Sequence, residues 1–273
     1  MDTLKITYTR RYVAYADILG FSSLVQKSTT DSGIFEILVQ ATSRLSQEEP
    51  FSQDKTLDNT VKRTLQGNFG ETWRSLYDSF SRGWGLTFSD NLFLSQPDNL
   101  QGLYILLLSL SMLARDLLSK GILIRGGVSI GEIYHSDRTV FGPALIDAIT
   151  LENKIAVYPR ILLSDKITQS IKQSCLGDNS TDSKFGNGCY VLMKRDFDGF
   201  YHLDYLSDKT FLDKTIQKPG GLSLDKLRNI VQSHLTRTKD CTKRVKWQWT
   251  LRYIEETMAR ARTKRTCGRP GYP

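Results

Sequence analysis

The feature that most constrains the fold is a long apolar stretch that is followed by a glycine and a second apolar stretch. Residues 104–114 are apolar apart from two serines, and this is about half of the ~20 residues that a membrane-spanning helix needs. The stretch lies inside a helical pattern that runs from about Asn99 to Lys120, and Gly121 is well placed to end that helix. Residues 122–130 then predict a buried strand. We therefore expect a globular protein with no membrane span.

The rest of the chain mixes strands, helices and hairpins in an irregular order. Strands are predicted at residues 11–17, 84–88, 91–95, 160–163, 189–194 and 200–206, and helices from 21 onward and at 34–45, 143–154, 223–236 and 242–261. Polar residues 45–70 predict a loop or an insertion. Because the elements do not alternate strictly, the predicted fold class is α+β, or mixed α/β, around one sheet that is flanked by helices.

Positive charge is concentrated at the C-terminal end. Residues 218–273 hold 14 Lys and Arg against four Asp and Glu, whereas residues 1–217 hold 23 against 25. We therefore divide the chain into a domain at 1–217 and a basic helical extension at 218–273. Such an extension could bind nucleic acid, although charge runs are more often solvated faces, so we consider a nucleic-acid partner unlikely.

Two further sequence features are uninformative about chemistry but bear on location. The four cysteines, at 175, 189, 241 and 267, are too scattered for a zinc knuckle and too few for a disulfide scaffold. The first apolar run begins at Tyr12 and is interrupted by Asp17, so it does not resemble a signal peptide. We expect a cytoplasmic protein.

The first candidate site follows the first predicted strand. Asp17 lies where that strand ends, Gly20 falls in the turn, and Phe21 and Ser22 begin the next helix. Free N–H groups at a helix N-terminus can hold phosphate oxygens, and a carboxylate beside them can hold the magnesium that bridges those oxygens. An ordinary helix cap is the alternative for such an Asp or Ser.

The second candidate site is the tip of the hairpin at residues 84–95. Asp90 lies there, where turn chemistry alone also favours aspartate. If the hairpin pairs beside the first strand, Asp17 and Asp90 can meet, and a pair of metal ions needs shared carboxylates of this kind. Arg125, on the strand at 122–130, could reach phosphate, but a structural ion pair is the favoured interpretation.

Four blocks of sequence together resemble the class III nucleotidyl cyclases. The Asp-Ile-x-Gly-Phe-Ser/Thr signature of that family resembles residues 17–22, and its Gly-Asp hairpin resembles residues 89–90. Its glycine-bearing strand resembles residues 124–131, and its Trp/Phe-Gly pair resembles residues 141–142. The resemblance covers residues 10–165 and implies a ferredoxin-like core. It also implies two Mg²⁺ or Mn²⁺ ions held by Asp17, Asp90 and the Ile18 carbonyl, and a triphosphate held by Gly20, Phe21 and Ser22.

The sequence departs from the purine-specific members at the positions that read the base. The family's lysine four residues before the second aspartate corresponds to Leu86, and its Asp or Thr before the Phe-Gly pair corresponds to Thr139. Leucine cannot donate a hydrogen bond to a purine. The family's transition-state Asn and Arg correspond to Ile146 and Thr150. A catalytically silent nucleotide-binding regulator is therefore the main alternative to an enzyme.

Shorter motifs resemble the pyrimidine cyclases of bacterial antiphage (Pycsar) systems. They are residues 142–144, 151–161, 196–199 and 204–206. This resemblance implies UTP or CTP as the substrate, with UTP favoured, and cUMP or cCMP as the product. It also implies a homodimer with composite active sites and a separate effector that senses the cyclic nucleotide during antiviral defence.

Overall fold

The apolar stretch forms the central helix of the fold. In the computed structural model it is α5 (Leu100–Ser119). The helix is long and apolar enough to cross a membrane, but 78% of its apolar window is buried inside the protein, as in a core helix. Asn99 caps it by accepting a 2.7 Å hydrogen bond from the Gly102 N–H. Gly121, at φ 72°, turns the chain out of the helix in a conformation that suits glycine.

The structure describes residues 7–43, 74, 84–136, 139–175, 181–207 and 223–267. The strands are β1 (Thr9–Leu19), β2 (Trp84–Phe88), β3 (Asn91–Pro97), β4 (Leu123–Ser136), β5 (Thr139–Phe141), β6 (Ile161–Leu163), β7 (Met193–Arg195) and β8 (Tyr201–Leu203). Besides α5, the helices are α1 (Phe21–Ser28), α2 (Ser32–Ser43), α6 (Pro143–Thr150), the π-helical turn η2 (Leu151–Ile155), α7 (Asp165–Ser174), α8 (Thr181–Val191), α10 (Leu224–Arg237) and α11 (Cys241–Cys267).

The strands form one mixed sheet, so the protein has the α+β class that the sequence predicts. The order is β2-β3-β1-β4-β6-β8-β7, and β5 pairs with β4 outside this path. The pair β4 and β6 is parallel, and the other neighbouring pairs are antiparallel. β1 therefore has a partner on each side, and β2 and β3 form the predicted hairpin.

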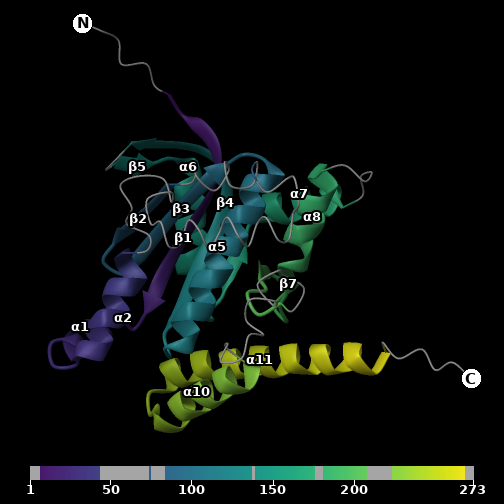
Figure 1. Ribbon diagram of the computed structural model, residues 1–273. Helices are drawn as coiled ribbons and strands as arrows, with labels where there is room; N and C mark the ends of the chain where they lie inside the picture. Colours follow the sequence, from purple (N-terminus) through teal and green to yellow (C-terminus); the bar gives the residue numbers. More distant parts are fainter. Residues whose placement is uncertain are drawn as a thin grey trace, which may run out of the picture.

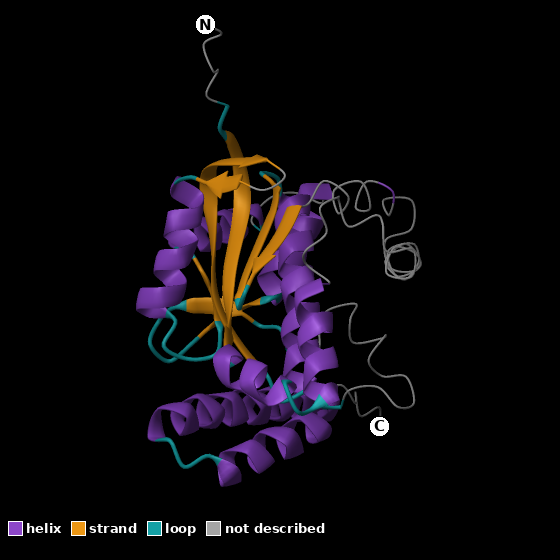
Figure 2. Cartoon of the chain, turned by 90° about the vertical axis from the view of Figure 1, so that its left-hand side faces the viewer, coloured by secondary structure: helices purple, strands orange, loops and turns teal. Residues whose placement is uncertain are grey.

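Helices cover the two faces of the sheet unequally (Figures 1 and 2). The large core lies on the face of α5 and includes Ala14, Ala16 and Ile18 of β1. A small cluster lies on the face of α6, where Val13 packs with Ala144 and Ala148. Alternate residues of β1 thus point to opposite faces, as a strand requires.

Small residues in β4 let α6 approach the sheet closely. A Cβ atom on Gly127 would lie 2.4 Å from the Ala148 carbonyl oxygen and 2.6 Å from the Leu151 Cβ. The Ser129 hydroxyl donates a hydrogen bond to the Ala144 carbonyl oxygen. At Gly131 the space is larger, because an added Cβ would be 3.5 Å from its nearest neighbour.

The basic C-terminal helices pack on the end of the sheet, where α10 and α11 lie across the bottom of the molecule in Figure 1. Trp247, Trp249, Tyr253 and Ile254 of α11 belong to the large core. The extension proposed from charge therefore shares its core with the sheet.

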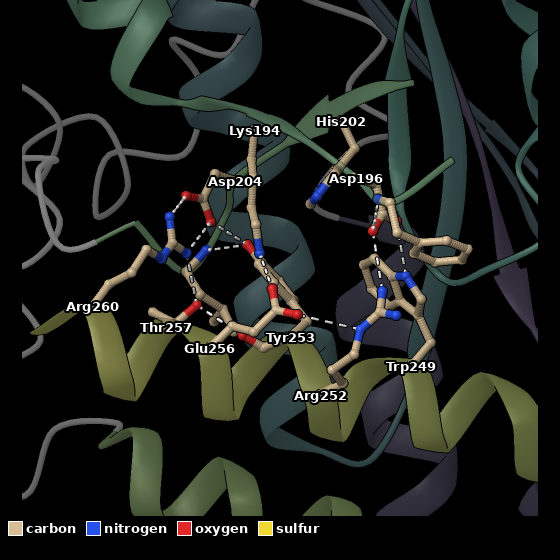
Figure 3. Close-up of polar contacts among 12 residues, drawn as sticks. Lys194, Asp196, His202, Asp204, Trp249, Arg252, Tyr253, Glu256, Thr257 and Arg260 are labelled. Carbon is tan, nitrogen blue, oxygen red and sulfur yellow. Dashed lines mark hydrogen bonds and ion pairs between the residues drawn. The ribbon is translucent and has the colours of Figure 1, made fainter. Parts of the chain in front are cut away.

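Polar contacts also join α11 to the β7–β8 hairpin (Figure 3). Asp196 accepts hydrogen bonds from the Trp249 indole at 2.9 Å and from Arg252 at 3.0 Å. Asp204 accepts from the Tyr253 hydroxyl at 2.7 Å and from Arg260 at 2.8 Å. Burial opposes the ionisation of Asp204, but Arg260 and Tyr253 hold its pKa below the ordinary value.

The predicted strand at residues 189–194 is wrong for most of its length. Helix α8 continues to Val191, and only Met193–Arg195 is a strand. The apolar run around Cys189 is helical because it packs on α5, with Gly188 tight against the ring of Tyr104. Helix α7 was not predicted at all. The predicted insertion at 45–70 lies outside the described residues.

We expect Gly127→Ala to destabilise the protein by about 1–3 kcal/mol, the usual cost of overpacking a tight contact. The new methyl group would collide with backbone of α6 and push η2 away from the sheet. Gly131→Ala on the same strand is the matched control, because its methyl group would make only ordinary contacts. Urea unfolding of both variants measures the difference. Equal stability of the two variants would contradict this account of how α6 packs.

A second prediction concerns the buried imidazole of His202, which lies edge-on to Trp249 and Tyr253. Burial lowers the pKa of His202 from 6.5 to about 4. Below pH 6.5 the unfolded chain therefore binds a proton that the folded chain does not, so stability falls as the pH falls toward 4. Between pH 7 and 5 this one group should remove about 2 kcal/mol.

His202→Gln lacks this titration, so its stability should depend less on pH over the same interval. The measurement is urea unfolding of both proteins at pH 7 and pH 5. The quantity to compare is the change in the free energy of unfolding between these two pH values, which is the slope of stability against pH. Any constant cost of the substitution cancels. An unchanged slope would show that His202 is not held neutral by the fold.

Candidate active site

Asp17 projects from the α6 face of the sheet. Ala16 and Ile18 on either side of it belong to the large core beneath α5, so Asp17 points the other way, with Tyr15 and Val13. Its register partners are Asn91 on β3 and Arg125 on β4. The carboxylate is therefore held in the middle of a sheet and not at a loose loop.

The β2–β3 hairpin brings Asp90 to Asp17. The Ile18 N–H donates a 3.0 Å hydrogen bond to the Asp90 carbonyl oxygen, and Ser89 takes the left-handed conformation, at φ 59°, that the tight turn needs. Burial raises the pKa of Asp17, and the negative charge of Asp90 raises it further. The two carboxyl groups that the sequence singled out are thus neighbours.

Arg125 links Asp17 to a third carboxylate. One of its Nη atoms lies 3.6 Å from Asp17 Oδ2 and also forms a close ion pair with Glu152. The Glu152 side chain is only 2% exposed. Burial raises the pKa of Glu152, and the Arg125 charge opposes that rise. Arg125 therefore has the ion-pair role that the sequence favoured.

Sequence reasoning did not identify Glu152 as a candidate site residue. It lies in η2, where the Ala156 N–H donates to the Leu151 carbonyl oxygen at 2.8 Å in place of a regular α-helical bond. Such π turns occur often at functional sites because they redirect a side chain within a helix. No local sequence signal marks this turn, and only the packing of α6 on β4 brings Glu152 to Arg125.

The turn after β1 leaves backbone donors available at the start of α1. Gly20 is left-handed, at φ 80°, and begins α1 with no side-chain cap. Its carbonyl oxygen accepts from Ser23 and Leu24, so within the described chain the N–H groups of Phe21 and Ser22 are the first-turn donors left for a ligand. The Ile18 N–H points toward Asp90. Because the N–H and C=O of one residue in an antiparallel strand point to the same side, the Ile18 carbonyl also faces the hairpin tip.

Leu86 and Thr139, the two positions that the cyclase resemblance assigns to base reading, lie elsewhere on the sheet. Leu86 is half-buried beside the α6-face cluster, opposite Phe93 in the hairpin. Thr139 is exposed and pairs with Ser136, whereas Asp17 pairs with Arg125, eleven residues earlier on β4. That interval is roughly 35 Å of strand length. Within a single protomer, Asp17 and Asp90 are therefore close together, and Thr139 is far from both.

No known family model matches this sequence, and no curated protein matches it significantly. Within the described ranges, no group of three or more His, Cys, Asp or Glu side chains is arranged to hold a metal ion. The Asp17–Asp90 pair is a smaller set, and carboxylate and carbonyl oxygens are the ligands that Mg²⁺ and Mn²⁺ prefer. These residues fit a divalent cation by their chemistry.

If the pair binds cations, Mn²⁺ should raise the thermal unfolding temperature of the protein, because a ligand that binds only the folded state stabilises it. Asp17→Asn and Asp90→Asn should each remove most of that rise. In EDTA, Asp17→Asn should be at least as stable as the parent, because the raised pKa of Asp17 means that its charge is unfavourable in the folded state.

The control is Asp147→Asn, which removes an exposed carboxylate from α6 and should keep the full Mn²⁺ effect. Differential scanning calorimetry with and without Mn²⁺ makes both comparisons. A Mn²⁺ effect that survives in both aspartate variants would place the cation elsewhere.

Proposed function

We propose that this protein is a class III nucleotidyl cyclase that converts a pyrimidine nucleoside triphosphate into its 3′,5′-cyclic monophosphate and pyrophosphate. The observation that carries the proposal is the meeting of Asp17 and Asp90 beside the turn at Gly20. The side chains of the two residues are close enough to interact directly. Burial raises the pKa of Asp17 and the charge of Asp90 raises it further, and both effects would be relieved by a cation between the two carboxylates.

Asp17, Asp90 and the Ile18 carbonyl would hold two Mg²⁺ or Mn²⁺ ions. When bound, such ions lower the pKa of the ribose 3′-hydroxyl and neutralise the triphosphate. The first-turn N–H groups of Phe21 and Ser22 would orient phosphate oxygens. In the reaction the 3′-oxygen forms a bond to the α-phosphorus, the hydroxyl proton leaves, and the bond from that phosphorus to pyrophosphate breaks.

The proposed substrate is UTP, with CTP as the second choice. Leu86 places an apolar side chain, in contact with the α6-face cluster, where purine-specific relatives carry an ammonium group. Without that donor a purine loses its hydrogen bond, and a small pocket excludes a second fused ring. The preference for UTP over CTP rests on the Pycsar resemblance alone.

The proposed active form is a homodimer with composite sites. Thr139, on β5, pairs with the end of β4 that is remote from the Asp17 site of its own chain, so a second copy would have to supply this residue. Ile146 on α6 is 65% exposed and offers apolar surface for such a contact. An active monomer in light scattering would contradict composite sites.

The Pycsar resemblance also supplies the biological part of the proposal. The product would be a second messenger in the cytoplasm that a separate effector protein senses during phage infection. The burial of α5 in the core agrees with a protein that needs no membrane.

A silent nucleotide-binding module is the second candidate. Ile146 and Thr150 occupy the positions of the transition-state Asn and Arg, and the Thr150 hydroxyl donates to the Ile146 carbonyl oxygen within α6. Neither group therefore offers a cation to the reacting phosphate. Retention of two neighbouring aspartates favours the enzyme over the silent module.

The decisive experiment incubates the purified chain with each of the four ribonucleoside triphosphates and Mn²⁺, and identifies products by mass spectrometry. We expect turnover of UTP or CTP well above that of ATP or GTP, by as much as ~10⁴-fold where buried polar groups go unpaired. Asp17→Asn and Asp90→Asn should abolish it, and Asp147→Asn should not. Efficient conversion of purines alone would overturn the substrate assignment, and no product at all would favour the silent module.

A further inference from the structure

Lys246 differs from the other described basic residues that face the protein from α11. Arg252 and Arg260 pair with Asp196 and Asp204 of the β7–β8 region. Lys246 is half-buried, yet among the described residues its ammonium group makes no ion pair or hydrogen bond. Holding a partly desolvated charge without a counter-ion is unfavourable.

The charges that act on Lys246 include two from the candidate active site, Arg125 and Asp17, and two from its own segment, Asp240 and Lys243. Burial lowers the pKa of Lys246, and the positive charge of Arg125 lowers it further, while Asp17 opposes this change. Arg125 is already paired with Glu152. The Lys246 ammonium group thus lies in the electrostatic field of Asp17 and Arg125. These two residues belong to the cluster formed by Asp17, Asp90, Arg125 and Glu152.

Packing of the neighbouring α11 residues holds Lys246 in position. The next residue, Trp247, stacks on His234 at 4.4 Å, and His234 fills the space over Gly121, just before β4 begins. One turn later, Trp249 is hydrogen-bonded to Asp196. Figure 1 shows α11 below the end of the sheet where β1 ends and β4 begins. The helix cannot easily turn its lysine away to solvent.

We propose that Lys246 binds the β- and γ-phosphates of the nucleoside triphosphate, and the pyrophosphate product, in the Asp17–Asp90 site. This inference rests on the proposed function and extends it to the C-terminal helix. Two divalent cations at the aspartates would reverse the charge of the cluster, and a polyphosphate would then balance both the cations and the unpaired ammonium group. An ammonium group is a strong donor to phosphate oxygens and accepts nothing, so it suits this end of the substrate and not the base.

The test compares Lys246→Met with Lys243→Met. Lys243 is exposed one turn earlier on the same helix, so its removal changes the net charge equally without touching the site. With UTP and Mn²⁺, Lys246→Met should raise KM and weaken inhibition by pyrophosphate by about tenfold or more. Lys246→Arg should restore most of the loss, and Lys243→Met should stay within about twofold of the parent.

Calorimetric binding of pyrophosphate in the presence of Mn²⁺ separates this inference from the proposed function, because it needs no turnover. If the parent binds pyrophosphate and Lys246→Met has lost that binding, Lys246 is a phosphate ligand even if no triphosphate is cyclised. If Lys246→Met binds as Lys243→Met does, the inference is overturned, whether or not the protein is a cyclase. If the parent neither binds pyrophosphate nor turns over a triphosphate, both proposals fall.

Discussion

The double pairing of β1 is the constraint on which the candidate site depends. The strand is hydrogen-bonded to β3 on one side and to β4 on the other, so Asp17 cannot shift without breaking both registers. A slip by one residue would turn Asp17 toward α5 and into an apolar core, where an unpaired carboxylate is very costly. The 3.0 Å bond from Ile18 to the Asp90 carbonyl extends the same pairing to the hairpin tip. The position of both carboxylates is therefore a property of the sheet.

The second constraint is the close approach of α6 to β4. Gly127 and Ser129 remove the bulk that would separate the helix from the strand, and the π turn that follows directs Glu152 at Arg125. Arg125 is thereby shared between Glu152 and Asp17. A ligand that binds Asp17 can replace Arg125 as the partner of this carboxylate, because Arg125 would still be paired with Glu152. The arrangement couples the packing of α6 to the charge at the aspartates.

Sequence alone predicted the elements whose signals are local. The apolar run that Gly121 ends defines α5, and the turn at Ser89 and Asp90 defines the hairpin. Sequence analysis failed for α8. Gly186 and Gly188 have low helix propensity, but in the structure they leave room for the side chains of Ser174 and Tyr104. Tertiary packing there outweighs helix propensity.

The same limit applies to the candidate site. Asp90 and Gly20 could be identified because each lies in a recognisable turn, and Asp17 because it lies near the end of the strand that leads into the turn at Gly20. Glu152 could not, because it reaches Arg125 only when α6 packs on the sheet. Lys246 could not, because the charges of Asp17 and Arg125 act on it only in the folded protein. The structure also separates Thr139 from the aspartates, which no local pattern could reveal.

The charge of the C-terminal helices has a different meaning in the structure from the one its composition suggests. A nucleic-acid-binding helix presents its cations outward along a phosphate backbone. In α11, Arg252 and Arg260 instead pair with Asp196 and Asp204, which are 7% and 4% exposed. These arginines therefore stabilise two buried carboxylates and hold the helix on the β7–β8 hairpin. The positive charge of these two arginines is thus matched within the fold.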